Sequence, residues 1–327
     1  MATFQRVIET VSDAKASAKR RNELIQQIEE LTGRPLLVYV ADFDKPNSFI
    51  QLEDKTGFSD LVEDIGGPAV DVLIHSPGGF AEVVESLVCI LRSQFLHVRF
   101  AVPNAAKSAA TLLCLSGDEL LLDNRSELGP IDPQAQYTTR DGQKYEAAED
   151  ILDGFGEARR LLQELGPSAV PAYVPLLDKL TLGLLQGCEV ARELSRTLAN
   201  TWLKNYMFKG SPRSQKPKNI TEYFASRKTS LSHGRAIGID QCLQVGLVVN
   251  DLRKPENAAL AALLWELWCV YELHFERTPV NKVYENAHGC QLEKMSVQVQ
   301  VNPATPPAPQ KQPPARPSAG RPGRRHP

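Results

Sequence analysis

Ser108 and the glycine pair Gly78-Gly79 are the residues whose types and spacing could carry out chemistry together. The glycines end the stretch Ser-Pro-Gly-Gly, residues 76–79, and Ser108 lies about 30 residues further on, in Ala-Lys-Ser-Ala-Ala-Thr. Adjacent glycines leave backbone N–H groups uncovered by side chains, and a serine hydroxyl at a helix start can attack a carbonyl group. Facing each other, the two loops would form a nucleophile beside an oxyanion hole. Taken separately, they are a tight turn and a helix N-cap.

The elements around these two loops predict that they face each other. Residues 70–75 form an almost wholly apolar run, typical of a strand that is buried on both faces. Alternating strands and helices favour a parallel sheet with right-handed crossovers. Because ligand sites form beyond the carboxyl ends of such strands, the loops after 70–75 and 97–103 are expected to meet there. The predicted strands are 35–41, 70–75, 97–103 and 118–123, and the predicted helices between them are 58–65, 80–91 and 108–117.

The flanking parts of the chain are predicted to be mainly helical. Residues 4–32 are charged and fit one helix or a helix pair that ends near Gly33. Beyond Pro133 we expect helices at about 146–165, 173–208 and 256–276, with one more strand at 245–252.

Composition indicates a globular chain and excludes several classes. The 327 residues are 42% hydrophobic and 23% charged, with a formal net charge of −2, so no nucleic-acid partner is expected. No run of 18 apolar residues predicts a transmembrane segment, and the charged N-terminal stretch does not resemble a secretory signal, so we expect a cytoplasmic location. The six cysteines are widely spaced without a CxxC pair, which favours reduced thiols over disulfides or a zinc site.

The C-terminal stretch has a different composition from the rest of the chain. Residues 303–327 contain nine prolines, five Lys or Arg residues and no acidic residue. Such a segment cannot bury a core, so we expect a disordered tail, with docking on a partner as an alternative role.

Two long stretches resemble a known family. The stretch DVLIHSPGGFAEVVESLVCILR, followed by VRFAVPNAAKSAATLLCLSGDELLLDNRSELGPIDPQ, is similar to the serine dehydrogenase proteinase family. That family is related to signal peptide peptidase A, within the superfamily of the Clp protease proteolytic subunit and the crotonases. The resemblance covers roughly residues 35–135 and returns weakly at 233–252.

The resemblance implies an α/β fold: a Clp protease/crotonase-like spiral of parallel strands with surrounding helices and a largely helical second half. It also implies homo-oligomers built by helical arms. On this basis the chain divides into an N-terminal helical arm at 1–34, a serine peptidase domain at 35–300 and a Pro/Arg-rich tail at 301–327.

The resemblance also implies the roles of the site residues. Ser108 matches the nucleophile of a serine endopeptidase-like hydrolase acting on a peptide or protein substrate. The backbone N–H groups of Gly79 and Ala109 match the oxyanion donors, and Gly78 shapes the turn. No metal or organic cofactor is implied.

The general base stays open at this stage. Clp-type subunits have a histidine near the stretch LGPIDPQ, where this chain has Ile131 and Asp132 and no histidine from 98 to 232. The signal peptide peptidase relatives use a lysine from a later segment, which points to Lys144 or Lys179. A lysine acts as a base near neutral pH only if burial lowers its pKa.

His233 is the third candidate for the base, since it precedes the last stretch that resembles the family. Two other functions are also possible: an inactive oligomeric scaffold of the same fold, or a crotonase-type acyl-thioester enzyme that uses the same oxyanion hole. The name of the family does not indicate a dehydrogenase here, because no GxGxxG stretch follows a predicted strand.

Overall fold

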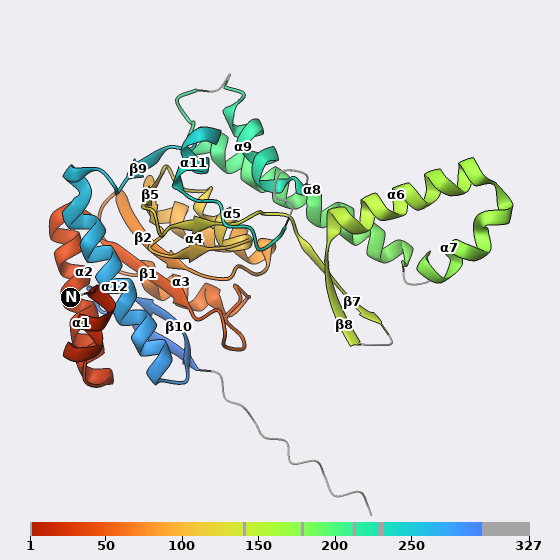
Figure 1. Cartoon of the computed structure of the whole chain (residues 1–327). Helices are drawn as coiled ribbons and strands as arrows, with labels where there is room; N and C mark the ends of the chain where they lie inside the picture. Colours follow the sequence, from red (N-terminus) through yellow and green to blue (C-terminus); the bar gives the residue numbers. More distant parts are fainter. Residues whose placement is uncertain (1, 140–141, 178–179, 212–213, 228–231, 296–327) are drawn as a thin grey trace, which may run out of the picture. The chain divides into compact units, whose positions relative to one another are not determined.

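The computed structural model describes residues 2–139, 142–177, 180–211, 214–227 and 232–295 (Figure 1). Its strands are β1 Leu36–Ala41, β2 Ala69–His75, β3 His97–Ala101, β4 Ala105–Ala106, β5 Glu119–Leu122, β6 Glu127–Leu128, β7 Gln134–Thr139, β8 Gly142–Ala147, β9 Val249–Asp251, β10 Val280–Glu285 and β11 Gln291–Met295. Its helices are α1 Thr3–Thr10, α2 Ala14–Thr32, α3 Asp54–Val62, α4 Ala81–Gln94, α5 Ala109–Cys114, α6 Ala148–Leu165, α7 Val170–Leu177, α8 Leu182–Asn205, α9 Lys216–Ala225, α11 Ile239–Val245 and α12 Ala258–Arg277, with short 3₁₀ turns at Pro167–Ala169 and Pro255–Asn257.

A mixed sheet is the centre of the fold. Seven described strands join it in the order β11-β10-β1-β2-β3-β5-β9. The strands β1, β2, β3, β5 and β9 run parallel to one another, joined by helical crossovers, while β10 pairs with β1 antiparallel. The predicted α/β class with a parallel sheet is therefore confirmed.

The sheet separates two hydrophobic cores, because successive side chains of a strand point to opposite faces. In β1, Leu37 and Tyr39 lie in the core that also takes side chains from α3, α4, α5, α8 and α9. Leu36 and Val38 lie in the other core, which takes side chains from α1, α2 and α12. Both faces of β1 are covered, which is why its sequence is a continuous apolar run.

The antiparallel strands β10 and β11 were not predicted. All six residues of β10 are buried, although its sequence, VNKVYE, contains a lysine and a glutamate. Lys282 pairs with Asp54, and Glu285 pairs with Arg21, each within 2.8 Å. These charges can be buried because each is neutralised by an ion pair. The strand β10 therefore has charged residues in its sequence, as an exposed segment would, although it lies inside the sheet.

The middle of the chain is less uniformly helical than predicted. The helix expected at 146–165 is confirmed as α6, and the one expected at 173–208 is divided into α7 and α8. The sequence predicted no element between Pro133 and this first helix, where β7 and β8 form an antiparallel hairpin. The strand expected at 245–252 is only three residues long, as β9.

The residues Pro255–Arg277 form the one described helix that is long and apolar enough to cross a membrane, with a mean hydropathy of 1.2. That value belongs to an 18-residue window of the helix, of which 56% is buried. Leu267, Trp268 and Tyr271 belong to the core beside α2. Such burial is typical of a core helix. The predicted tail, 301–327, lies outside the described residues.

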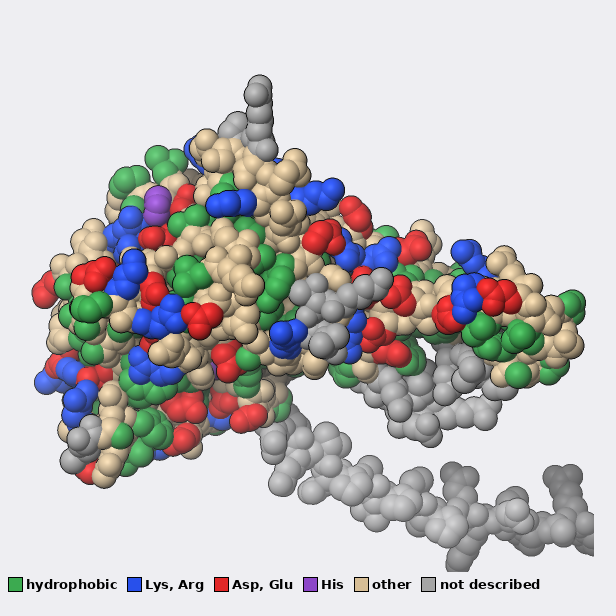
Figure 2. Space-filling model, turned by 45° about the horizontal axis from the view of Figure 1, so that its top comes forward, with side chains coloured by type: hydrophobic (Ala, Val, Ile, Leu, Met, Phe, Trp, Pro, Cys, Tyr) green, Lys and Arg blue, Asp and Glu red, His purple; other side chains and the backbone are tan. Residues whose placement is uncertain are grey.

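Charges of both signs are interspersed on one face of the molecule. On the face that Figure 2 shows, Lys and Arg side chains alternate with Asp and Glu side chains among the described residues. That face has no continuous basic stripe of the kind that follows a nucleic-acid backbone.

Candidate active site

Ser108 has an unusual backbone conformation. It lies between β4 and α5 with φ 50° and ψ −119°, outside the regions that residues with a side chain normally occupy. Although it stands at the N-cap position of α5, its side chain makes no capping hydrogen bond with the described backbone. Backbone strain of this kind persists where the surrounding structure enforces it, which is common at functional sites.

Gly78 is the neighbour that allows this conformation. Its φ is 97°, and a Cβ atom built on it would lie 2.5 Å from the Lys107 carbonyl oxygen and 2.8 Å from the Ser108 Cβ atom. Any side chain at position 78 would therefore collide with the Ser108 loop. The two loops that the sequence predicted to face each other are in direct contact.

Gly79 is held by a second segment. Gly79 forms a parallel bridge with Ile50, whose N–H donates to the Gly78 oxygen at 2.7 Å and whose oxygen accepts from Phe80 N–H at 3.0 Å. In such a bridge the N–H of the middle residue points away from the partner strand. Neither Gly79 N–H nor Ala109 N–H donates a hydrogen bond within the described part of the chain. Two backbone donors, one in each loop, thus have no partner among the described residues.

Asp132 and His233 form a pair that the sequence did not reveal. Asp132 Oδ1 lies 2.9 Å from His233 Nδ1, and its side chain is 1% exposed, against 32% for the histidine. A carboxylate can only accept, so in the neutral imidazole the proton is on Nδ1 and the lone pair is on Nε2. An imidazole with this tautomer can accept a proton from a neighbouring hydroxyl.

Three adjacent segments carry these side chains. The strand β4, which precedes Ser108, pairs with β6, and Leu128 of β6 bridges Ile237 on its other side. Thr111 adds a connection, because its Oγ1 accepts from Gly129 N–H at 2.8 Å and donates to the Ala106 oxygen at 2.6 Å. The segment with Asp132 therefore runs between the segments that carry Ser108 and His233.

The two lysine candidates for the base, Lys144 and Lys179, lie after the stretch that carries Asp132. Lys144 is in β8, opposite Tyr137, in a hairpin whose next residue, Tyr145, is 67% exposed. Lys179 lies outside the described residues. Lys107, the neighbour of Ser108, donates to Glu127 Oε2 at 2.7 Å.

His75 ends β2 beside these loops and has a structural environment. Its Nδ1 accepts from Ala105 N–H at 3.2 Å, and its ring packs between Phe43 and Trp268, with centroids 4.5 and 3.9 Å away. Burial lowers the pKa of His75 to about 3, so the ring stays neutral. A neutral ring that already uses Nδ1 holds this strand end in place.

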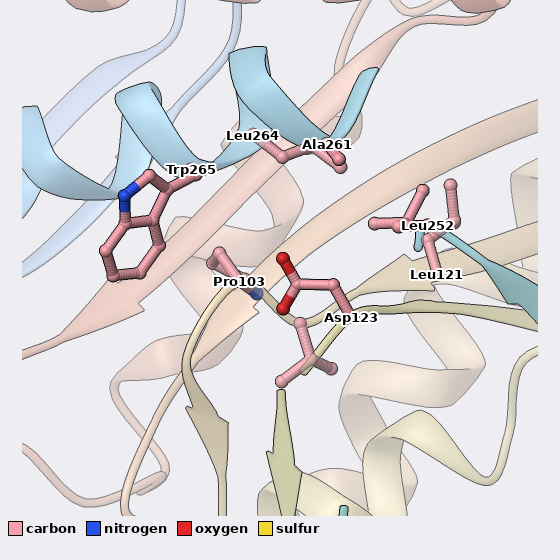
Figure 3. Close-up of a pocket in the computed structure, with 8 residues that line it drawn as sticks. Pro103, Leu121, Asp123, Leu252, Ala261, Leu264 and Trp265 are labelled. Carbon is pink, nitrogen blue, oxygen red and sulfur yellow. The ribbon is translucent and has the colours of Figure 1, made fainter. Parts of the chain in front are cut away.

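Two further features concern metal binding and cavities in the described part of the chain. Among the described residues, no group of three or more His, Cys, Asp or Glu side chains could hold a metal ion. A pocket beneath α12 has room for about one water molecule and is lined by none of the candidate residues (Figure 3). Its lining residues are Val102, Pro103, Leu121, Asp123, Leu252, Ala261, Leu264 and Trp265.

Asp132 is the residue that sequence reasoning missed. The sequence marked it only as standing where related subunits have a histidine. A usable signal was its place between Ile131 and Pro133, in a stretch that follows two buried strands closely. An acidic residue in such a stretch needs a partner, and His233 was the only histidine between 98 and 273.

Residues 49–151 match the family model described as ClpP-like SDH-type serine proteinase. The matched segment includes the Ser108 loop, both glycines and Asp132, and the resemblance stated from the sequence is confirmed over it. Two uncharacterized proteins of Methanocaldococcus jannaschii are also similar. One is 30% identical over 148 residues, which are 42% of this chain and 47% of the relative. The other is 29% identical over 144 residues, 42% and 48% of the two chains. The match thus spans about half the length of these relatives.

The solved structures that the chain resembles have low identity and low TM-scores. A mutant of the 1510-N membrane-bound stomatin-specific protease is 14% identical, with a TM-score of 0.38, over 65% of this chain and 79% of that one. A mutant of ClpP1 from Listeria monocytogenes is 10% identical, with a TM-score of 0.36, over 71% of this chain and 98% of that one.

Proposed function

We infer from the match of residues 49–151 to the ClpP-like SDH-type serine proteinases that this chain is a serine peptidase, with Ser108 as its nucleophile. The observation that most supports this role is the backbone of Ser108, held at φ 50° against Gly78, with a hydroxyl that caps no described helix N–H. A serine that served only as a helix cap would bond its own helix.

The general base in this proposal is His233, oriented by Asp132. The buried carboxylate accepts from Nδ1–H at 2.9 Å, which directs the lone pair of Nε2 away from it. Nε2 takes the hydroxyl proton of Ser108 as its Oγ attacks the peptide carbonyl, and Asp132 stabilises the imidazolium that forms. The chain order Ser, Asp, His is also that of the α/β-hydrolase triads.

The oxyanion of the tetrahedral intermediate accepts hydrogen bonds from two backbone N–H groups, those of Gly79 and Ala109. The imidazolium then protonates the leaving amine, and the peptide C–N bond breaks to give an acyl-enzyme. A water molecule, deprotonated by His233, hydrolyses the ester. Each backbone donor contributes about 3 kcal/mol to the transition state.

The test of this function is covalent labelling. The wild-type chain is expected to react with a fluorophosphonate probe at Ser108 and to hydrolyse fluorescein-labelled casein. Ser108→Ala should abolish both signals while the melting temperature is kept. Labelling that persists in Ser108→Ala would refute the assignment.

We also propose that copies of the chain associate through the segment from α6 to α8. Large apolar side chains are exposed there: Leu165, Val170, Val174, Leu182 and Val190. Exposed apolar groups that gather on one segment favour a protein contact. Sedimentation equilibrium of the full chain measures the association.

A further inference from the structure

The position of Gly79 N–H depends on the backbone of Ile50. A Cβ atom built on Gly79 would lie 2.2 Å from the Ile50 oxygen, and the two backbone hydrogen bonds of Ile50 flank Gly79 on both sides. Any shift of Ile50 therefore moves the oxyanion donor. The contacts that hold Ile50 in place therefore determine the orientation of Gly79 N–H.

One buried ion pair holds the residues on both sides of Ile50. Lys282 Nζ donates to the Phe49 carbonyl oxygen at 2.5 Å and to both oxygens of Asp54, at 2.8 and 3.0 Å. Asp54 Oδ2 in turn accepts from Gln51 N–H at 2.8 Å. Both charged side chains are 0% exposed. The ion pair thus clamps residues 49 and 51 around Ile50.

Two tyrosines complete the cluster around Asp54. Tyr39 from β1 donates to Oδ2 at 3.2 Å, and Tyr284 from β10 donates to Oδ1. The Tyr284 ring also packs against Gly57 of α3, where a Cβ atom would lie 2.5 Å from it. The Asp54 carboxylate is therefore held by side chains from β1 and β10, and its own helix, α3, packs against β10.

Stability alone does not account for this arrangement. Replacing a buried ion pair with apolar side chains of similar volume is often neutral or stabilising, because burial removes the hydration of both charges. Buried hydrogen-bonded charges do supply fixed geometry. Here the groups they fix are the backbone atoms next to Ile50.

We propose that Lys282 and Asp54 are positioning residues that set the oxyanion hole through Ile50. The inference rests on the proposed function, in which Gly79 N–H is an oxyanion donor. Lys282 belongs to β10, outside the residues 49–151 that match the family model. A strand from a late part of the sequence therefore holds the 49–51 loop, which belongs to the matched segment.

Loss of this clamp should affect the transition state more than substrate binding. Without Nζ, the Phe49 oxygen loses its side-chain donor and Asp54 loses its closest cation, so the 49–51 backbone can shift together with Gly79. Misplacement of a catalytic group by about 1 Å lowers a rate by about 100-fold. We therefore expect kcat to fall while KM changes little.

The experiment compares Lys282→Met with Arg21→Met. Arg21 is a matched control, because it is also 0% exposed and pairs with β10, through Glu285, without contacting residues 49–51. After fluorophosphonate titration of active sites, kcat and KM are measured with an N-acyl amino acid p-nitrophenyl ester. The inhibition constant of phenylboronic acid, which mimics the tetrahedral intermediate, is measured alongside.

Lys282→Met should lose about 10- to 100-fold in kcat per titrated site, with a matching loss in boronate affinity and KM within about twofold. Arg21→Met should lower the melting temperature and keep kcat per site. The double variant Asp54→Asn/Lys282→Met leaves no buried charge unpaired. It should recover stability relative to Lys282→Met and still lack most of the kcat.

The results separate the alternatives. Unchanged kcat per site in Lys282→Met overturns the inference, as does full recovery of kcat in the double variant. If Lys282→Met does not fold, the double variant alone decides. A wild-type chain that neither reacts with the fluorophosphonate nor hydrolyses the ester refutes the proposed function itself. The results for the Lys282 variants bear only on the inference about the clamp.

Discussion

A Cβ atom at Gly78 would lie 2.8 Å from the Cβ atom of Ser108, so the two residues touch through backbone and side chain with no space between them. The contact explains why a glycine stands there. It also explains how a serine can keep φ at 50° in a folded chain, since the loops enclose it.

Gly78→Ala should therefore inactivate the protein. The methyl group would meet the Lys107 oxygen at 2.5 Å, and φ 97° is unfavourable for alanine, so the Ser108 loop must move. We expect kcat/KM for the ester to fall at least about 100-fold. Gly67→Ala is the control, because Gly67 has φ 95° and nothing within 4 Å of the new methyl group. Equal activity in the two variants would contradict the contact argument.

Asp132→Asn should leave the fold intact and lower kcat by about 10³- to 10⁴-fold, as expected when the orienting carboxylate of a triad becomes an amide. The amide can donate to Nδ1, which favours the wrong tautomer of His233. The measurement is the burst rate of ester hydrolysis. Asp71→Asn is the control, since Asp71 is another buried carboxylate, paired with Arg99 at 2.7 Å. Activity kept by Asp132→Asn would exclude it as the orienting group.

A histidine base and a lysine base predict different activities for the variants at positions 233 and 144. If His233 takes the proton, His233→Gln should lose at least about 10³-fold in kcat while Lys144→Met stays near wild type. The reverse order of activities would assign the base to the hairpin β7–β8. Steady-state ester hydrolysis distinguishes the two cases, with titrated sites correcting for folded protein.

His75 should make stability fall in acid. Burial lowers its pKa from the usual 6.5 to about 3, so the unfolded state binds a proton between these values and the folded state does not. Its contribution is complete above about pH 6.5 and is lost toward pH 3, with a slope of up to about 1.4 kcal/mol per pH unit.

The measurement for His75 is urea unfolding from pH 4.5 to 7.5. His75→Asn keeps an acceptor for Ala105 N–H and cannot titrate, so its unfolding free energy should vary less with pH than that of the wild type. The variant will be less stable throughout, because it loses the ring between Phe43 and Trp268. Parallel curves for the two proteins would show that His75 does not carry the effect.

The parts of the fold that depend on local pattern could be predicted from the sequence. The strand β2 is an apolar run and α4 has a one-face repeat, and both are where the sequence placed them. The strand β10 could not be predicted in this way. Its charges are neutralised by Arg21 and Asp54, which lie more than 220 residues away along the chain.

The candidate site shows the same limit. Ser108 and the glycines stand in short motifs, so sequence alone brought them together. Asp132 and His233 are 101 residues apart, and they meet through the Leu128–Ile237 bridge, which no local pattern reveals.

The antiparallel pairing of β10 with β1 has a consequence for biosynthesis. Val38 pairs with Glu285, so one of the innermost contacts of the sheet joins an early part of the chain to a late one. Chains emerge from the ribosome at about 5–20 residues per second, so β1 waits on the order of ten seconds or more for this neighbour. Until then Asp54 has no Lys282, and the loop against Gly79 has no clamp. On the inference above, a growing chain would be unable to hydrolyse peptides until almost the whole described fold had been synthesised.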